Sequence, residues 1–265
     1  MSAAAVAMPF PARSGALPGQ RETADRLMSA LRSEEFVLFA QPILPASPTA
    51  GDRPFQEILV RFLEEEEKLL PPGSFIPVLE SFRLMTYLDR WALNRTARWL
   101  LRQPVSRGAS RNALNLSEDT LLDPGFAAFV EKQIASSGIA GAALCFEVPL
   151  AEAISHGDPV LELAAALKPL GCALSLSSCD GSPGSMRTLE LLKPEFVKIA
   201  SGLIGRMDRD PMEAATVEGI HQRCRDLGIR TIAEHVERPQ TLEIVRGIGI
   251  DYVQGYLVGR PAALS

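Results

Sequence analysis

The sequence predicts an α/β fold, a TIM-like (β/α)8 barrel, and three observations support that prediction. Apolar segments typical of strands recur along the chain, and helical segments separate most of them. Several helical segments end in glycine just before the next strand, as in "LKPLGC", "RDLGI" and "RGIGI". A glycine beyond a helix end accepts the left-handed conformation that stops the helix. The length of 265 residues also suits a barrel, which commonly occupies about 250 residues.

Eight strand candidates favour a closed barrel over an open sheet. They cover residues 36–44, 55–63, 112–117, 143–150, 172–178, 196–200, 230–236 and 251–259. A polar turn, "PASPTAGDRP", joins the first two without a helix, so we expect one early strand to run antiparallel to the rest. The segments "MTYLDRWALNRTARWLLRQ" and "DPGFAAFVEKQIASSG" carry apolar residues at helical spacing.

The chain divides into an arm and a single domain. Residues 1–20 are rich in Ala, Pro, Gly and Ser and predict a disordered N-terminal arm, whereas residues 21–265 predict one barrel domain. The arm lacks a basic stretch before its apolar run, and no segment approaches ~18 consecutive apolar residues. The net charge of −5 gives no general attraction to DNA or to an anionic membrane. We therefore expect a cytoplasmic domain that binds neither.

Cysteine and histidine usage indicates neither disulfides nor zinc. The four cysteines form no CxxC pair, so we expect buried free thiols in a reducing compartment. They are Cys145, Cys172, Cys179 and Cys224. The three histidines, His156, His221 and His235, show no zinc-ligand spacing.

Polar side chains recur where the predicted strands end. Active sites of such barrels collect at the carboxyl ends of the strands, and a lone buried carboxylate is costly. The polar residues at or near these ends are Glu57, Asn115, Glu147, Ser177, Ser178, Lys198, Glu234 and Gln254. Their recurrence on separate strands favours one shared site over eight separate partners. Oxygen ligands of this kind suit Mg²⁺, Mn²⁺ or Ca²⁺.

Short motifs occur in a fixed order from about Phe36 to Pro261. They read "QPIL", "EILVRF", "FIPVLES", "NLS", "FEV", "VKI", "AEHVE" and "DYVQGYLVGRP". Together they resemble the EAL domain family, the barrel of bacterial cyclic di-GMP phosphodiesterases. The resemblance implies a role in bacterial signal transduction. In active members it implies two divalent metals, Mg²⁺ or Mn²⁺, that bind the phosphodiester and activate water.

The resemblance assigns a role to most of the polar residues at the strand ends. It implies that Lys198 helps to position the attacking water and that Glu234 is a second catalytic residue. A guanidinium such as that of Arg61 suits phosphate. The implied metal ligands are Glu57, Asn115, Glu147 and Glu234, and the implied nucleotide contacts are Gln41, Arg61, Glu237 and Gln254.

The stretch "SLSSCDGSPG" departs from the family pattern. The family has two aspartates, which hold the metals and the water, where this chain has Ser177 and Ser178. A serine hydroxyl is neutral and a weak ligand for a hard cation. Leu150 and Ala200 also replace acidic residues of the family. The departures predict a degenerate phosphodiesterase whose metal site is weak or absent, with Ca²⁺ as the cation to test for binding.

Three functions remain open. We favour a receptor that binds cyclic di-GMP without hydrolysis and acts through an unidentified protein partner; a homodimer is compatible with the resemblance. The first alternative is a nucleotide-independent protein-interaction module. The run "EEEEK", from Glu64, would repel an anionic ligand, although a solvated charge run explains it more simply. The second alternative is a weak metal-dependent phosphodiesterase in which Asp180 replaces a lost ligand.

Overall fold

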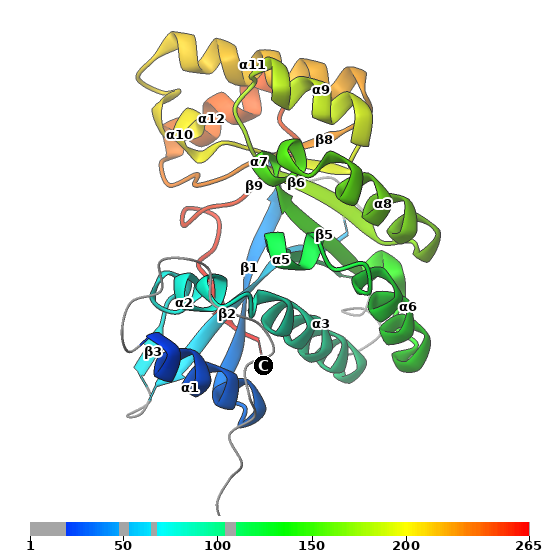
Figure 1. The fold of residues 1–265 in the computed structure, drawn as a ribbon. Helices are drawn as coiled ribbons and strands as arrows, with labels where there is room; N and C mark the ends of the chain where they lie inside the picture. Colours follow the sequence, from blue (N-terminus) through cyan, green and yellow to red (C-terminus); the bar gives the residue numbers. More distant parts are fainter. Residues whose placement is uncertain (1–19, 48–52, 65–67, 104–109, 265) are drawn as a thin grey trace, which may run out of the picture.

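The computed structural model describes residues 20–47, 53–64, 68–103 and 110–264. Within them, eight strands close into a barrel, and helices cover its outside (Figure 1). Around the barrel the order is β1-β9-β8-β7-β6-β5-β4-β2, and the β1–β2 pairing closes the ring. The predicted (β/α)8 fold class is therefore confirmed.

The strands of the barrel follow the predicted segments closely. They are β1 (Phe36–Pro45), β2 (Phe55–Glu64), β4 (Arg111–Asn115), β5 (Leu144–Pro149), β6 (Ala173–Cys179), β7 (Phe196–Ile199), β8 (Arg230–Ala233) and β9 (Tyr252–Val253). Two short strands, β3 (Lys68–Leu70) and β10 (Ala262–Ala263), extend the sheet beyond the ring. The helices are α1 (Gln20–Arg32), α2 (Ile76–Ser81), α3 (Met85–Arg102), α5 (Glu118–Leu121), α6 (Phe126–Ser137), α7 (Leu150–Ser155), α8 (Gly157–Leu167), α9 (Pro183–Leu192), α10 (Ser201–Arg206), α11 (Pro211–Asp226) and α12 (Pro239–Ile248).

Strand β1 is the antiparallel strand of the barrel. Its register with β2 runs from Phe36 opposite Phe62 to Ile43 opposite Phe55, and it also pairs antiparallel with β9. The remaining strands of the ring pair in parallel. The expectation of one early antiparallel strand is confirmed. The tip of the connecting turn, residues 48–52, lies outside the described residues.

Two expectations about the ends of the chain have different outcomes. The predicted arm, residues 1–20, lies outside the described residues except for Gln20, where α1 begins. The last strand is shorter than predicted, because β9 ends at Val253 and the chain then turns. A side chain on Gly255 would collide with the backbone of Val236, and Leu257 N donates to Val236 O. This close approach of two backbones ends the strand.

Side chains that point into the barrel form layers along its axis. The middle layer is a small apolar cluster to which every strand of the ring contributes: Ile43, Phe55, Ala113, Cys145, Ala173, Phe196, Ile232 and Tyr252. Because side chains of a strand alternate between its two faces, residues two positions away also point inward. The residues two positions from each member of this cluster, on the side of the barrel mouth, therefore form a second inward-pointing layer. They are Gln41, Glu57, Asn115, Glu147, Ser175, Lys198, Glu234 and Gln254. The polar layer at the mouth thus lies directly above an apolar plug.

Outward-facing strand residues form the main core with the helices. Ile58, Leu114, Phe146 and Val197 are buried in this cluster. The four cysteines are buried free thiols, as predicted. Among the helices that the structure describes, none combines the length and apolar character needed to cross a membrane.

A buried carboxylate on α3 holds the segment that follows β4. Asp89 Oδ2 accepts hydrogen bonds from Ser117 N (2.9 Å), Ser117 Oγ (2.7 Å) and Thr120 Oγ1 (2.7 Å). These bonds fasten α5 and the end of the "NLS" motif to α3. Burial nevertheless raises the pKa of Asp89 to about 6, because the hydrogen bonds only partly offset the loss of solvation.

Asp89 should therefore make stability depend on pH. Its pKa rises from 3.8 to about 6 in the folded state, so its stabilising contribution is complete at low pH and is lost as pH rises through that interval. Relative to Asp89→Asn, which keeps an acceptor oxygen but does not titrate, the wild type should lose roughly 3 kcal/mol of unfolding free energy across it. Urea unfolding of both proteins at several pH values measures this difference. A difference that does not vary with pH would contradict the assignment.

Candidate functional site

The polar layer at the barrel mouth is organised around one buried ammonium group. Lys198 Nζ on β7 lies 2.8 Å from Glu57 Oε2, 2.8 Å from Glu147 Oε2 and 3.4 Å from Glu234 Oε1. Lys198 is 1% exposed, so water solvates it little. Four strands thus bring one cation and three carboxylates together, as the sequence predicted for a shared site.

The protonation of this cluster follows from burial and proximity. Burial alone would lower the pKa of Lys198, but Glu147 and Glu57 raise it well above its ordinary value. Glu57 is also buried, yet the ammonium of Lys198 keeps its pKa below the ordinary value. Burial raises the pKa of Glu147 to about 8, against the opposing effect of Lys198. The cluster therefore centres on a charged lysine paired with an ionised Glu57, and Glu147 is the carboxyl group of the cluster whose pKa is raised.

Amide side chains complete the hydrogen bonding of Glu57. Asn115 Nδ2 donates to Glu57 Oε1 at 2.8 Å, and Gln254 Nε2 donates to Glu57 Oε2 at 2.7 Å. Gln254 Nε2 also lies 3.3 Å from Gln41 Oε1, while Gln41 Nε2 donates to Gly259 O at 3.0 Å. Residues predicted as metal ligands and as nucleotide contacts therefore belong to one continuous network.

The two serines at the end of β6 lie beside this network and not within it. Among the described residues no hydrogen bond joins the side chain of Ser177 or Ser178 to the Lys198 cluster. Ser178 is exposed and has φ of 63°, and the β6–β7 register shifts between Leu176 and Cys179. The pairing irregularity thus falls on the two positions, Ser177 and Ser178, at which the resemblance places the two aspartates of the family. Neither serine supplies a negative charge there.

Asp180 lies in the loop before α9 and is hydrogen-bonded there through one carboxylate oxygen. Its Oδ1 accepts from Ser182 N at 3.0 Å and from Ser185 Oγ at 2.5 Å, at the start of α9. The hydrogen bond from Ser185 lowers the pKa of Asp180, and the residue is exposed. The carboxylate is thus engaged in shaping the loop before α9.

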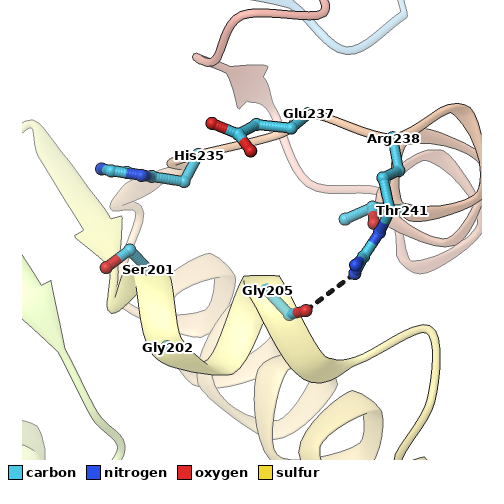
Figure 2. A pocket seen from close by; sticks show the side chains of 7 residues that line it. All are labelled: Ser201, Gly202, Gly205, His235, Glu237, Arg238 and Thr241. Carbon is cyan, nitrogen blue, oxygen red and sulfur yellow. Dashed lines mark hydrogen bonds between the residues drawn. The ribbon is translucent and has the colours of Figure 1, made fainter.

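A pocket of about 310 Å³ lies next to the barrel mouth, between α10 and the segment that joins β8 to α12 (Figure 2). His235 and Glu237 project over Ser201 and Gly202 of α10, and Arg238 closes one end by donating to Gly205 O at 2.7 Å. His235 has φ of 55°, a left-handed conformation that suits the glycine usual in the family at this position. Glu237, a predicted nucleotide contact, therefore lines a hollow that is open to ligands.

Arg61 lies further along β2 than Glu57. It points to the same side of the strand, four residues on, which is about 13 Å along β2. Its Nη1 donates to Val60 O at 2.9 Å, and its guanidinium carbon lies 5.7 Å from the centre of the Phe39 ring. Arg61 is half-buried, and the remaining donors of its guanidinium are available to an anion at the mouth.

The residues that could hold a metal are Glu57, Asn115, Glu147 and Glu234, but the three carboxylates already surround an ammonium and Asn115 donates to Glu57. Both oxygens of Glu57 already accept hydrogen bonds. Within the described parts of the chain, one group of three ligating side chains has all its donor atoms within 4.8 Å of one another: Glu118, Glu152 and His156. That group lies on α5 and α7, outside the barrel interior. The carboxylates around Lys198 do not meet the same spacing.

One member of the polar layer was missed by the sequence analysis. Ser175 points into the barrel between Glu147 and Lys198 in ring order, is fully buried, and its Oγ has no hydrogen-bond partner. The strict alternation of "ALSLSS" was the signal, since Ser175 and Ser177 lie on one face of the strand. Asp89 was missed as well, although it lies on the apolar face of α3 together with Met85 and Leu93.

Sequence comparison places the chain in a known group of proteins. Residues 24–261 match the model of the EAL domain. The chain is 31% identical over 258 residues to the cyclic di-GMP phosphodiesterase PdeF of Escherichia coli, covering 95% of this chain and 34% of PdeF. It is 29% identical to the cyclic di-GMP phosphodiesterase PdeB of Shewanella oneidensis, covering 91% of this chain and 28% of PdeB. The chain thus spans about a third of the length of these relatives.

Solved structures agree with this similarity. The MucR phosphodiesterase of Pseudomonas aeruginosa in complex with c-di-GMP is 26% identical, with a TM-score of 0.82 and coverage of 91% of this chain and 97% of that chain. The FimX EAL domain of Xanthomonas citri, in complex with c-diGMP, has a TM-score of 0.84 at 24% identity, covering 92% and 96%. The second likeness shows the shared fold.

The Lys198 cluster should be a main determinant of stability. Lys198→Met leaves Glu57 buried without its counterion, and removing one partner of a buried pair costs about 3–5 kcal/mol. Lys132→Met, an exposed change on α6, should stay within about 0.5 kcal/mol of wild type. Denaturant unfolding of the two variants measures both effects.

A second change distinguishes loss of the charge pair from loss of packing. Adding Glu57→Gln to Lys198→Met removes the unpaired carboxylate and should recover part of the lost stability. If Lys198→Met were as stable as Lys132→Met, the ammonium would not be the centre of the site.

Proposed function

This chain belongs to the EAL domain family, and we propose that it is a receptor that binds cyclic di-GMP at the barrel mouth without hydrolysing it. One observation carries the proposal: the Lys198 ammonium already lies among the carboxylates that a metal pair would require, 2.8 Å from Glu57 and Glu147 and 3.4 Å from Glu234. The two aspartate positions of the family are Ser177 and Ser178 in this chain. The proposal therefore has two parts: binding of cyclic di-GMP is retained, and its hydrolysis is lost.

The loss of hydrolysis follows from charge. Two divalent cations 3.5–4 Å apart, a typical separation in two-metal sites, need several anionic oxygens to offset their repulsion. In this chain Glu57 and Glu147 already pair with the Lys198 ammonium, and the two serines are neutral. The residues present therefore do not fit a metal pair, and water at this site has no activating cation. Lys198 itself is held as an ammonium and cannot act as a base.

Nucleotide binding depends on side chains that are still present although the two aspartates are replaced. Arg61 offers guanidinium donors to a phosphate, Gln41 and Gln254 offer amide groups, and Glu237 lines the adjacent pocket. Lys198 offsets a carboxylate beneath these groups, so an anionic ligand meets less repulsion than three free carboxylates would produce. A solved relative, MucR at 26% identity, holds c-di-GMP.

The acidic run from Glu64 to Glu67, which motivated a nucleotide-independent interaction module, falls largely outside the described residues. The nucleotide-independent interaction module is therefore tested by the binding experiment, which would favour it if cyclic di-GMP does not bind. A receptor also requires a protein that responds to ligand binding. We expect an unidentified protein partner that distinguishes the free barrel mouth from the mouth with cyclic di-GMP bound.

Binding should be saturable and independent of divalent metal. In a calorimetric titration, cyclic di-GMP should bind with a dissociation constant of about 1 μM or tighter, equally with chelator and with Ca²⁺. Arg61→Ala should weaken binding at least about tenfold, since it removes charge-assisted hydrogen bonds to phosphate. Ser177→Ala should leave the affinity unchanged.

The exposed Arg98→Ala on α3 is the matched control for lost positive charge and should bind like wild type. No saturable heat at high nucleotide concentration would contradict a receptor and favour the interaction module. A large loss from Ser177→Ala would mean that the ligand lies elsewhere at the mouth.

Hydrolysis should be absent. Incubated with cyclic di-GMP and Mg²⁺ or Mn²⁺, the wild type should give no more linear dinucleotide than a metal-free control, because no metal pair forms. Chromatography of the nucleotides checks this. Product above the control, abolished by Glu57→Ala, would instead establish a weak phosphodiesterase.

A further inference from the structure

Arginines line the amino-terminal end of the barrel, opposite the mouth. Arg53, Arg111 and Arg230 each stand two residues before a member of the apolar plug, namely Phe55, Ala113 and Ile232. The alternation that points the plug inward also points Arg111 and Arg230, the first residues of β4 and β8, inward, and the charge of Arg53 lies close enough to Arg111 to lower its pKa. All three are half-buried. We call this set the arginine floor.

Two of the floor guanidiniums stack on the same ring. The guanidinium carbon of Arg111 lies 4.7 Å from the centre of Phe196, and that of Arg230 lies 4.4 Å from it. The two cations are therefore separated by no more than the sum of these distances. Each also contacts a second ring, Phe55 at 5.5 Å for Arg111 and Tyr252 at 5.9 Å for Arg230. The aromatic plug holds the guanidiniums in place without neutralising them.

The donors of Arg111 and Arg230 are largely unused. Arg230 Nη1 donates to Tyr252 Oη at 3.2 Å, whereas Arg111 Nε is buried and has no hydrogen-bond partner. Among the described residues, neither Arg111 nor Arg230 forms an ion pair. Burial, followed by the charges of Arg230 and Arg53, lowers the pKa of Arg111, as expected where like charges converge.

The carboxylates at this end of the sheet are engaged elsewhere. Glu195 Oε2 accepts from Leu174 N at 2.7 Å. Asp251 Oδ2 accepts from Thr231 N at 2.8 Å and from Thr231 Oγ1 at 3.0 Å. Both residues lie on the outward faces of their strands, and their carboxylates bind the sheet backbone. The positive charge at the axis is left without a matching anion from them.

We propose that the arginine floor is a binding site for a phosphate group, separate from the nucleotide site at the mouth. A phosphate dianion offsets the converging charges of the arginines better than a single carboxylate does. Its oxygens can accept from two guanidinium forks at once, and charge-assisted N–H···O bonds are about 2.8 Å long. The stacked rings hold both forks ready, so little side-chain freedom is lost on binding.

Titration with inorganic phosphate, followed by calorimetry at constant ionic strength against chloride, tests this site. The wild type should bind one phosphate with a dissociation constant on the order of 1 mM. Arg230→Gln should weaken binding at least about tenfold, since it removes one fork. Arg230→Lys keeps the charge and should give an intermediate affinity, which keeps the test valid if the glutamine variant does not fold.

Two control variants separate this site from other basic groups. Arg98→Gln on the outside of α3 should bind inorganic phosphate as the wild type does, and Arg61→Ala reports any phosphate that binds at the mouth instead of the floor. If Arg61→Ala alone abolishes binding, the phosphate occupies the mouth and the proposal is wrong. Absence of any phosphate binding, or an equal loss in Arg98→Gln, would also overturn it and leave the arginines as a cover for the plug.

Adenosine 5′-monophosphate serves as the second probe and identifies the source of the phosphate. Binding tighter than that of inorganic phosphate indicates a nucleotide, and equal affinity indicates free phosphate. In both cases Arg230→Gln must remove the binding. Because cyclic di-GMP recognition uses Arg61 at the other end of the barrel, failure of the floor proposal leaves the receptor proposal untouched.

Discussion

The site depends on a single buried ammonium. Lys198 is 1% exposed, and burying such an ion without partners costs several kcal/mol. Glu57 and Glu147, each 2.8 Å away, together with Glu234 at 3.4 Å, make the position tolerable. The same contacts keep the carboxylates in one plane of the barrel and leave Glu57 with no free oxygen. Lys198 is thus the cation around which the carboxylates of the site are arranged.

The layered interior explains how both ends of one barrel can carry charge. Strand alternation with a period of two places the carboxylate cluster above the apolar plug and the arginine floor beneath it. Phe55, Phe196 and Tyr252 contact one another across the axis and separate the two charged layers. The two anion sites that we propose, at the mouth and at the floor, therefore use different residues that the same barrel holds.

Much of this arrangement was predictable because it follows from local rules. Glycine-terminated helices, eight apolar segments and the motifs at their ends identify the barrel, the antiparallel strand and the residues that meet at the mouth. The residues that escaped prediction depend on contacts between distant segments. The close approach of Gly255 to Val236 ends β9 early. The burial of the Asp89 carboxylate is understandable only from the hydrogen bonds that it accepts from Ser117 and Thr120. Likewise, the sequence identifies Lys198 and allows its pairing with these glutamates, but the distances of 2.8, 2.8 and 3.4 Å that establish the pairing depend on contacts between distant segments.

The most direct test of the account is a crystal structure of the protein with cyclic di-GMP and excess Mn²⁺, with anomalous data that locate manganese. We predict an intact nucleotide at the mouth, Lys198 still paired with Glu57 and Glu147, and no manganese among these carboxylates. Manganese bound by Glu57 and Glu147, with Lys198 displaced, would contradict the central claim that this ammonium has replaced the metals.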